Sequence, residues 1–171
     1  MVINDKGLLF LLGAGPGRSG TGCRLVILSK ACEYAIRAVL LLATMDRSHY
    51  VPVRRLAKEL DISAHFLSKI CHDLTQHGLL VSQKGPNGGV ALGKPPEQIR
   101  LIDVVEAIDG LDSFQRCVLG LEPCGDEFPC PVHASWAKIK EQLHELLTKE
   151  NIQTFAEELS AGVTTLRIER P

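Results

Sequence analysis

Apolar residues recur at helical spacing through two neighbouring segments near the middle of the chain. In residues 53–60 they stand at i, i+3, i+4 and i+7, the pattern of a helix with one buried face: Val53, Leu56, Ala57 and Leu60. In residues 64–77 a second stripe has the same kind of spacing: Phe66, Leu67, Ile70, Cys71 and Leu74. Ser63 can cap the second helix, and Gly78 can end it. Two helices joined by residues 61–63 predict a helix-turn-helix.

A β-hairpin is predicted directly after the second helix. Residues 79–83 read as a short strand, residues 84–88 (Lys-Gly-Pro-Asn-Gly) have the composition of a turn, and residues 89–92 read as the return strand. A helix-turn-helix followed at once by a hairpin with Gly and Pro at its tip is a winged helix. The expected fold class is therefore mainly α, with a small β-hairpin wing.

A winged helix predicts double-stranded DNA as a partner, because the major groove admits one helix and a narrow loop can reach the adjacent minor groove. If the apolar stripe of residues 64–77 faces the core, the polar residues near its start face outward toward base edges. The expected groove-reading residues are Ser63, His65, Ser68 and Lys69. Arg54 and Arg55 would meet phosphates. The wing would enter the minor groove with Lys84, Gly85, Pro86 and Asn87. The alternative is that these side chains are ordinary solvated groups on a small helical protein.

Further helices are predicted on both sides of the winged helix. One follows Ser29, its N-cap, to about Met45, and another spans residues 102–108 and ends at Gly110. Residues 135–149 form a long helix with these inward residues: Trp136, Ile139, Leu143, Leu146 and Leu147. A last helix covers residues 152–159. The chain then divides into a DNA-binding domain at 26–110, an irregular loop at 111–133, helices at 134–160 and a flexible tail at 161–171.

Residues 1–25 differ from the rest, because a short apolar run is followed by a glycine-rich stretch. A signal peptide is disfavoured, since Asp5 and Lys6 cancel and no cleavage site follows. Residues 15–20 spell G-x-G-x-x-G, but no helix opens on this loop and no acid stands about 20 residues beyond it, which disfavours a dinucleotide site. A Walker loop needs a lysine where Thr21 stands. We expect a disordered leader or a mis-assigned translation start.

The net charge of -1 conceals an uneven distribution. Residues 24–100 carry 11 Lys/Arg against 6 Asp/Glu, whereas residues 101–171 carry 6 against 13. A basic front half and an acidic back half fit a DNA-facing part joined to a part that stays away from DNA. No segment is long enough to span a membrane. No substrate pocket or pattern of catalytic bases is evident, so the protein is not expected to be an enzyme.

Three of the six cysteines fall within 14 residues of an acidic loop that contains Gly and Pro: Cys117, Cys124 and Cys130. Without an exported context, clustered thiols favour a metal over a disulfide. Zinc sites prefer C-x2-C pairs, so intervals of six and five residues make zinc a weaker choice. Thiolates suit an iron–sulfur cluster, which normally needs a fourth donor from elsewhere. Cys71 is expected to be a small core residue. Cys32 is expected to be structural, with an approach to the cluster beside Glu33 as the alternative.

Three segments together resemble the IscR/NsrR-type repressors, the Rrf-two family of winged-helix regulators. They are residues 28–38 (LSKACEYAIRA), the winged helix with its tip at residues 84–89 (KGPNGG), and the three-cysteine loop. The resemblance covers about residues 28–159. It implies a homodimer in which the long C-terminal helix pairs with that of the partner, which makes residues 134–160 the dimerisation helices. Dimer symmetry in turn implies an inverted-repeat operator with half-sites about one helical turn apart.

The resemblance also implies an iron–sulfur cluster, [2Fe–2S] or [4Fe–4S], on Cys117, Cys124 and Cys130. IscR-like members take the fourth ligand from a histidine three residues past the last cysteine, which matches His133. NsrR-like members use an acid on the first helix of the other subunit, which matches Glu33. Both residues are present, so the fourth ligand and the cluster type stay open. Lys84, His65 and Ser68 differ from their IscR-like counterparts, so the same operator sequence is not expected.

These observations predict a cytoplasmic DNA-binding sensor. It would be a repressor whose DNA affinity changes when nitric oxide, oxygen or iron shortage alters its cluster. One alternative is a winged helix whose cysteine loop holds a structural zinc ion. Another is a metal-free switch based on a disulfide between Cys117 and Cys130. A redox enzyme or electron carrier is the least favoured class.

Overall fold

The computed structural model describes residues 2–3, 9–10, 27–85, 88–112 and 116–166. Within the expected leader, β1 (Val2–Ile3) pairs antiparallel with β2 (Leu9–Phe10). The rest of residues 1–25 lies outside the described residues, as do Pro86 and Asn87 of the wing. Among the helices that the structure describes, none is both long enough and apolar enough to cross a membrane.

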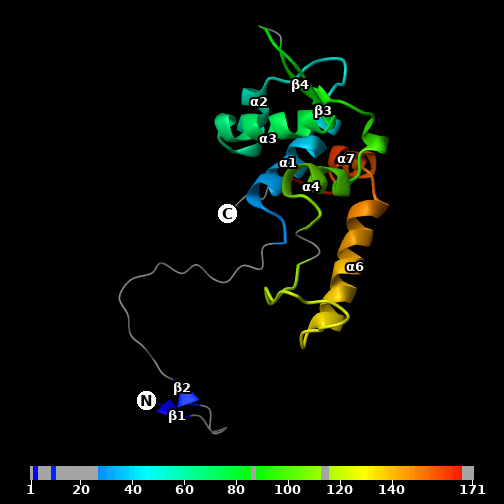
Figure 1. Cartoon of the computed structure of the whole chain (residues 1–171). Helices are drawn as coiled ribbons and strands as arrows, with labels where there is room; N and C mark the ends of the chain where they lie inside the picture. The colour runs from blue at the N-terminus through cyan, green and yellow to red at the C-terminus, as the bar shows by residue number, and fades with distance from the viewer. Residues whose placement is uncertain (1, 4–8, 11–26, 86–87, 113–115, 167–171) are drawn as a thin grey trace.

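The helix-turn-helix is present, and it packs on the first helix of the body. α1 (Lys30–Ala43), α2 (Val53–Leu60) and α3 (Ala64–Gln76) contact one another around a shared apolar core (Figure 1). Ser29 caps α1 as predicted, because its side chain accepts a hydrogen bond of 3.1 Å from the Cys32 backbone N–H. Ser63 occupies the N-cap position of α3, but within the described residues its side chain makes no capping hydrogen bond.

The apolar stripe of α3 is buried at four of its five predicted positions: Leu67, Ile70, Cys71 and Leu74. The prediction was wrong for Phe66, which is 36% exposed. This residue lies at the edge of the stripe, and its ring packs edge-on against Tyr34 of α1 with 6.0 Å between the ring centroids. The core therefore begins one position further along α3 than the periodicity indicates.

The wing is anchored to the body by a bridge to the segment before α2. β3 (Leu80–Gln83) and β4 (Gly89–Leu92) form an antiparallel hairpin in which Leu80 pairs with Leu92. Val51 and Val90 exchange two backbone hydrogen bonds of 2.9 Å. A Cβ atom on Gly89 would lie 2.2 Å from the Val51 carbonyl oxygen, so only glycine allows this close approach. The base of the wing is thereby fixed relative to α2.

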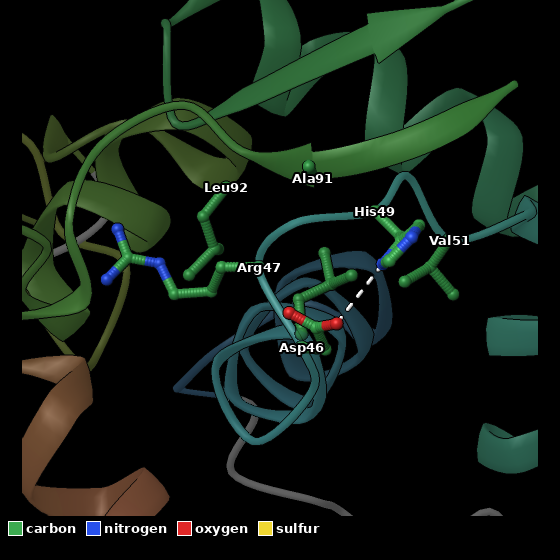
Figure 2. A pocket seen from close by; sticks show the side chains of 7 residues that line it. Asp46, Arg47, His49, Val51, Ala91 and Leu92 are labelled. Carbon is green, nitrogen blue, oxygen red and sulfur yellow. Dashed lines mark hydrogen bonds and ion pairs between the residues drawn. The ribbon is translucent and has the colours of Figure 1, made fainter.

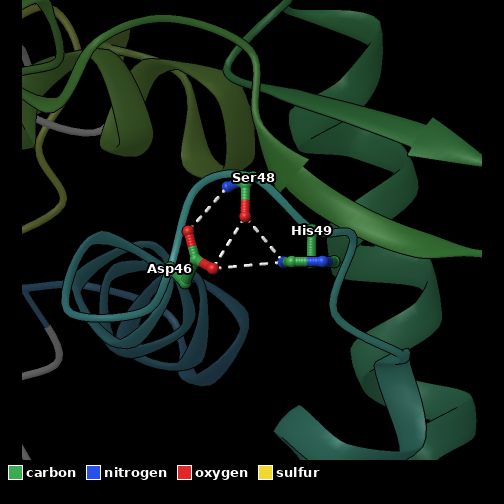
Figure 3. A network of polar contacts seen from close by, with 3 residues as sticks. All are labelled: Asp46, Ser48 and His49. Carbon is green, nitrogen blue, oxygen red and sulfur yellow. Dashed lines mark hydrogen bonds and ion pairs between the residues drawn. The ribbon is translucent and has the colours of Figure 1, made fainter.

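The loop between α1 and Val51 holds a small polar network (Figure 3). Asp46 accepts hydrogen bonds from the Ser48 hydroxyl at 2.7 Å and from the Ser48 backbone N–H at 2.9 Å, and it pairs with His49 Nδ1 at 3.1 Å. These bonds lower the pKa of Asp46 to about 2, with the Ser48 hydroxyl as the largest cause. The loop therefore keeps its anchored carboxylate at every pH above strongly acidic values.

The same loop borders an open hollow of about 360 Å³ beneath β4. Figure 2 shows Asp46 and His49 turned toward each other on one side of this hollow, with Arg47 extended away from them. Leu42, Val51 and Leu92 form its apolar floor. Asp46 and His49 pair with each other and with Ser48, so these polar groups are engaged within the loop.

The C-terminal helices divide between the body and a projection. α4 (Leu101–Asp109) packs against α1, and the short 3-10 helix η1 (Pro96–Gln98) contacts α7 (Ile152–Ser160). α7 also packs on α1, and its buried Ile152 belongs to the main core. The expected dimerisation segment at 134–160 thus includes a helix that is part of the DNA-binding body.

α6 (His133–Lys149) extends away from the body and carries the cysteine loop at its far end (Figure 1). Near its C-terminal end, Leu147 packs in a second apolar cluster with Cys32, Ile102 and Val105. The prediction that the whole apolar stripe of this helix faces inward was wrong within the single chain. Ile139 is 48% exposed and Leu146 is 57% exposed.

The tail beyond α7 returns to the body over the part that the structure describes. The Arg37 guanidinium donates hydrogen bonds to the Leu60 carbonyl at 3.3 Å and to the Leu166 carbonyl at 3.4 Å. Leu166 also packs against the main core. The predicted flexible tail, residues 161–171, therefore has a docked first half, while residues 167–171 lie outside the described residues.

The central position of α3 leads to a stability prediction. Leu67 is fully buried, so Leu67→Ala is expected to lower the free energy of unfolding by about 2–5 kcal/mol through lost burial and a residual cavity. Ser68 is the next residue and is exposed, so Ser68→Ala should stay within about 0.5 kcal/mol of the parent. Urea unfolding followed by circular dichroism measures both. Equal stability of the two variants would contradict the placement of α3 in the core.

Candidate functional site

The described residues of the predicted DNA surface are all exposed. Ser63, at the start of α3, is exposed together with three residues of the same helix: His65, Ser68 and Lys69. Arg54 and Arg55 are exposed on α2, and Lys84 and Gly85 are exposed at the wing. An open hollow of about 460 Å³ runs along the outer side of α3 and is lined by His65, Ser68, Lys69, His72 and Asp73.

A second hollow, of about 260 Å³, joins α3 to the wing. Its polar lining comes from both elements: Ser68, His72, Thr75, Ser82 and Gln83. Sequence reasoning missed Thr75, Ser82 and Gln83 as surface candidates. The signal was present in part, because a strand with one buried end and polar residues beyond it presents those residues to solvent. Only the placement of the hairpin beside α3 shows that they share a surface with the helix.

The three cysteines of the predicted metal loop converge. Within the described residues, the sulfur atoms of Cys117, Cys124 and Cys130 all lie within 4.8 Å of one another, so the three thiols could hold one metal ion. The sulfur atoms of Cys117 and Cys130 are 3.6 Å apart. The indole N–H of Trp136 on α6 donates a hydrogen bond of 3.0 Å to the Arg116 carbonyl, which ties the start of the loop to the helix.

The thiols differ in acidity for identifiable reasons. The Leu121 backbone N–H, which has the largest effect, and the Leu119 backbone N–H stabilise the Cys117 thiolate and lower the pKa of Cys117 to about 7. The Cys130 backbone N–H favours the Cys124 thiolate, but desolvation and the two neighbouring thiols outweigh this effect, so the pKa of Cys124 is raised. The Cys117 thiol therefore ionises near neutral pH, and a metal ligand must be deprotonated in this way.

The two predicted fourth ligands are placed differently. His133 is the first residue of α6, and its Nδ1 lies 3.3 Å from the Cys124 sulfur. Its Nε2 lies 3.4 Å from Asp126 Oδ1 on the opposite edge of the ring. Glu33 lies on α1, where its carboxylate forms an ion pair with Lys30 of the same chain. Within one chain, His133 is therefore the candidate that adjoins the thiols.

The remaining described cysteines are structural, as expected. Cys32 is fully buried, and burial, with a smaller contribution from Asp109, raises its pKa to about 12. Cys71 is 3% exposed, and burial raises its pKa to about 11. Neither thiol ionises readily, so neither is suited to metal binding or to rapid oxidation.

This contrast predicts the order of alkylation in metal-free, reduced protein. Iodoacetamide reacts with thiolates, so Cys117 should be modified well before Cys32 and Cys71 at pH 7.5. The rate at Cys117 should rise from about pH 6 to about pH 8 and then level off, because its pKa lies near the middle of that window. Peptide mass spectrometry after timed quenching gives the order. Faster modification of Cys71 than of Cys117 would contradict the described environments.

Comparison with known proteins identifies the family. The model of the Rrf2 family, described as iron-dependent transcriptional regulators, matches residues 28–158 of the chain. The chain belongs to the Rrf2 family. The matched range contains the helix-turn-helix, the wing, the cysteine loop and α6.

Curated relatives are described as transcriptional regulators with a helix-turn-helix. An HTH-type transcriptional regulator of Aquifex aeolicus is 32% identical over 130 residues, which cover 75% of this chain and 90% of that protein. The transcriptional regulator IscR of Cronobacter sakazakii is 32% identical over 111 residues, which cover 65% of this chain and 68% of the relative. The protein is accordingly a transcriptional regulator, as its relatives are, and not an enzyme.

Solved structures share the fold. IscR of T. potens matches with a TM-score of 0.64 at 20% identity, covering 81% of this chain and 91% of that one. CymR, the global cysteine regulator of B. subtilis, matches with a TM-score of 0.62 at 23% identity, covering 79% and 96%. At these identities the likeness establishes the winged-helix fold alone.

Proposed function

We propose that this Rrf2 regulator is a homodimeric repressor whose affinity for an inverted-repeat operator is set by an iron–sulfur cluster. The observation that carries the cluster is the convergence of three sulfur atoms within 4.8 Å in the loop before α6. The three cysteines are half-buried and most of the described loop around them is exposed, so nitric oxide, oxygen or a change in iron–sulfur supply would reach a cluster bound there. The operator side of the proposal rests on the exposed polar face of α3 and the wing.

In the DNA-bound state α3 would lie in the major groove. Ser63, His65, Ser68 and Lys69 would meet base edges, because they are exposed near the N-terminal end of the helix. Arg54 and Arg55 would contact phosphates, and the wing, residues 84–87, would enter the minor groove. The hollow between α3 and the wing, with its hydroxyl and amide groups, offers a polar path for the phosphate backbone between these two grooves.

The donor set at the cysteine loop fits a cluster. Three thiolates are soft donors, and the backbone N–H groups that lower the pKa of Cys117 favour the charged form that binds iron. The fourth donor we propose is His133, because its ring already lies against Cys124. Glu33 of a partner subunit is the alternative, in keeping with its half-exposed position on α1. A bound cluster would supply an oxidisable centre at the N-terminal end of α6, the end far from the body.

The fold offers a physical route from the loop to the DNA face. The loop connects α4 to α6, and α4 packs against both α1 and α3. At the other end of α6, Leu147 contacts Ile102 of α4 and Cys32 of α1 in the second apolar cluster. A change in the loop would therefore shift two elements that support the recognition helix. In a dimer the same shift would change the distance between the two half-site readers.

The test is an anaerobic comparison of cluster-loaded and cluster-free protein. A brown protein with visible absorption, and iron and sulfide in its native mass spectrum, is expected. The two forms should differ in affinity for an operator fragment selected from a random double-stranded DNA library. Equal affinity of both forms for all DNA would reject the proposal. A colourless protein that holds stoichiometric zinc would indicate that the cysteine loop binds a structural zinc ion and no cluster.

A disulfide switch is the second candidate, and one observation favours it. The Cys117 and Cys130 sulfurs are 3.6 Å apart, and the Cys117 thiol has a pKa of about 7. A peroxide could oxidise the Cys117 thiolate, and Cys130 could then displace water to form the disulfide. Mass spectrometry of air-exposed protein would detect this bond. If metal-free protein forms it reversibly and DNA affinity follows it, the disulfide switch is preferred.

A further inference from the structure

We propose that Asp126 is a positioning residue that fixes the tautomer of His133, so that Nδ1 is the ring atom presented to a metal. This inference rests on the proposed function, because it concerns the fourth donor of the cluster proposed above. It adds a residue that neither the cysteine spacing nor the position of the histidine indicates.

The imidazole of His133 lies between two groups of different character. Its Nδ1 faces the Cys124 sulfur at 3.3 Å, and its Nε2 faces Asp126 Oδ1 at 3.4 Å. The side chain of His133 is 21% exposed, whereas that of Asp126 is fully exposed. The carboxylate therefore covers the outer edge of the ring, and the thiol group lies at the inner edge.

This arrangement decides which nitrogen carries the proton. A neutral imidazole has one N–H donor and one nitrogen with a free lone pair. An ionised carboxylate can only accept, so the favoured tautomer places the proton on Nε2 toward Asp126. The lone pair of Nδ1 is then directed to the side where Cys124 lies. Metal-bound histidines in general donate their second N–H to such an acceptor, which fixes the ring orientation.

The backbone around these residues is already held, which leaves the ring as the variable part. The His133 backbone N–H donates to the Cys130 carbonyl at 3.0 Å, and α6 begins at this residue. A hydrogen bond of 3.5 Å from the Gly125 N–H to the Phe128 carbonyl closes the turn that contains Asp126. These bonds fix the backbone positions of His133 and Asp126. The contact between the carboxylate and Nε2 then selects the orientation and the tautomer of the ring.

The first experiment uses the cluster-free, reduced full-length protein and reads the tautomer directly. Long-range ¹H–¹⁵N correlation spectra of His133 should show the proton on Nε2 in the parent. Asp126→Ala should give a mixture of tautomers, and Asp126→Glu should restore the Nε2–H form. Glu127→Gln is the matched control, because it removes the same charge from the adjacent residue while Asp126 still faces the ring. An unchanged spectrum in Asp126→Ala would overturn the proposal.

The second experiment uses the protein reconstituted with iron and sulfide under anaerobic conditions. Histidine labelled with ¹⁵N at Nδ1 alone should give a strong hyperfine coupling in pulsed electron paramagnetic resonance of the reduced cluster. Asp126→Ala should weaken or redistribute this coupling and shorten the half-life of the cluster by about tenfold, in line with the loss of the carboxylate that faces the outer edge of the ring. The Glu127→Gln control should match the parent in both measurements.

The outcomes separate this inference from the proposed function. Coordination through Nε2, or a parent-like signal in Asp126→Ala, overturns the role of Asp126 and leaves a cluster-dependent regulator intact. A cluster without nitrogen coupling overturns the role of Asp126 and excludes His133 as the fourth ligand, which leaves Glu33 of a partner subunit as the alternative. Protein that binds no cluster at all overturns the proposed function as well.

Discussion

Replacing Cys117, Cys124 and Cys130 together by serine is expected to abolish the dependence of operator affinity on iron. The three sulfurs converge in one loop, and serine hydroxyls are poor ligands for a cluster. The parent protein should bind its operator with affinities that differ by about 5- to 150-fold between the loaded and cluster-free states, the usual range of coupling between two sites. The variant should bind with one affinity. Anaerobic fluorescence anisotropy with the selected operator fragment measures both.

Cys23→Ser is the control for this experiment, because in the sequence it stands far from the cysteine loop at residues 111–133. It should keep both the visible absorption and the iron dependence of the parent. The triple variant must also retain the parent's far-ultraviolet circular dichroism, which is expected because all three thiols lie in the loop and outside the two apolar clusters. If the operator affinity of the triple variant still depends on iron, the sensing site lies elsewhere in the protein.

Introducing acids on the outer side of α6 is expected to break the dimer and with it operator binding. Ile139 and Leu146 are 48% and 57% exposed and lie seven residues apart, so they share one side of the helix. Exposed apolar stripes of this kind mark surfaces that pack against a partner. Ile139→Asp combined with Leu146→Asp should therefore yield a monomer. Its affinity for the two-half-site operator should fall by about 100-fold or more, because the second half-site loses its effective concentration.

Sedimentation velocity gives the oligomeric state, and the same anisotropy assay gives the affinity. Lys138→Asp is the matched control, because it places an acid at an exposed position on a different side of α6. This control should remain dimeric. Since both apolar side chains are exposed in the single chain, the double variant should keep the parent's far-ultraviolet circular dichroism. A dimer of unchanged affinity would show that α6 does not form the interface.

Much of the site could be predicted because each part has a short-range signature. A stripe of apolar residues predicted α3. The polar residues outside that stripe were then predicted to face DNA. The cysteine loop was found by the density of thiols. The role of Asp126 could not be predicted in this way, since an acidic loop offers several carboxylates and only the position of the His133 ring distinguishes one of them.

Phe66 shows how the same periodicity can mislead. It fits the stripe of α3 by spacing, but the core is bounded by α1, and the ring at the boundary packs on Tyr34 while it remains in contact with solvent. Ile139 and Leu146 show the converse case. Their apolar pattern is real, but in the described residues the second apolar cluster includes Leu143 and Leu147 of α6 and leaves Ile139 and Leu146 exposed.

The sequence by itself determined the winged helix, the order of its elements and the cysteine loop, because helical periodicity, turn residues and clustered thiols are encoded within a few neighbouring positions. Tertiary structure alone decided that α7 belongs to the body, that Arg37 binds the returning tail, and that Cys124, His133 and Asp126 lie in a row. These contacts join residues whose proximity depends on how whole helices pack, and packing is set by the shapes of many side chains together. The arrangement of Cys124, His133 and Asp126 therefore depends on the packing of α6 and could not be predicted from the sequence.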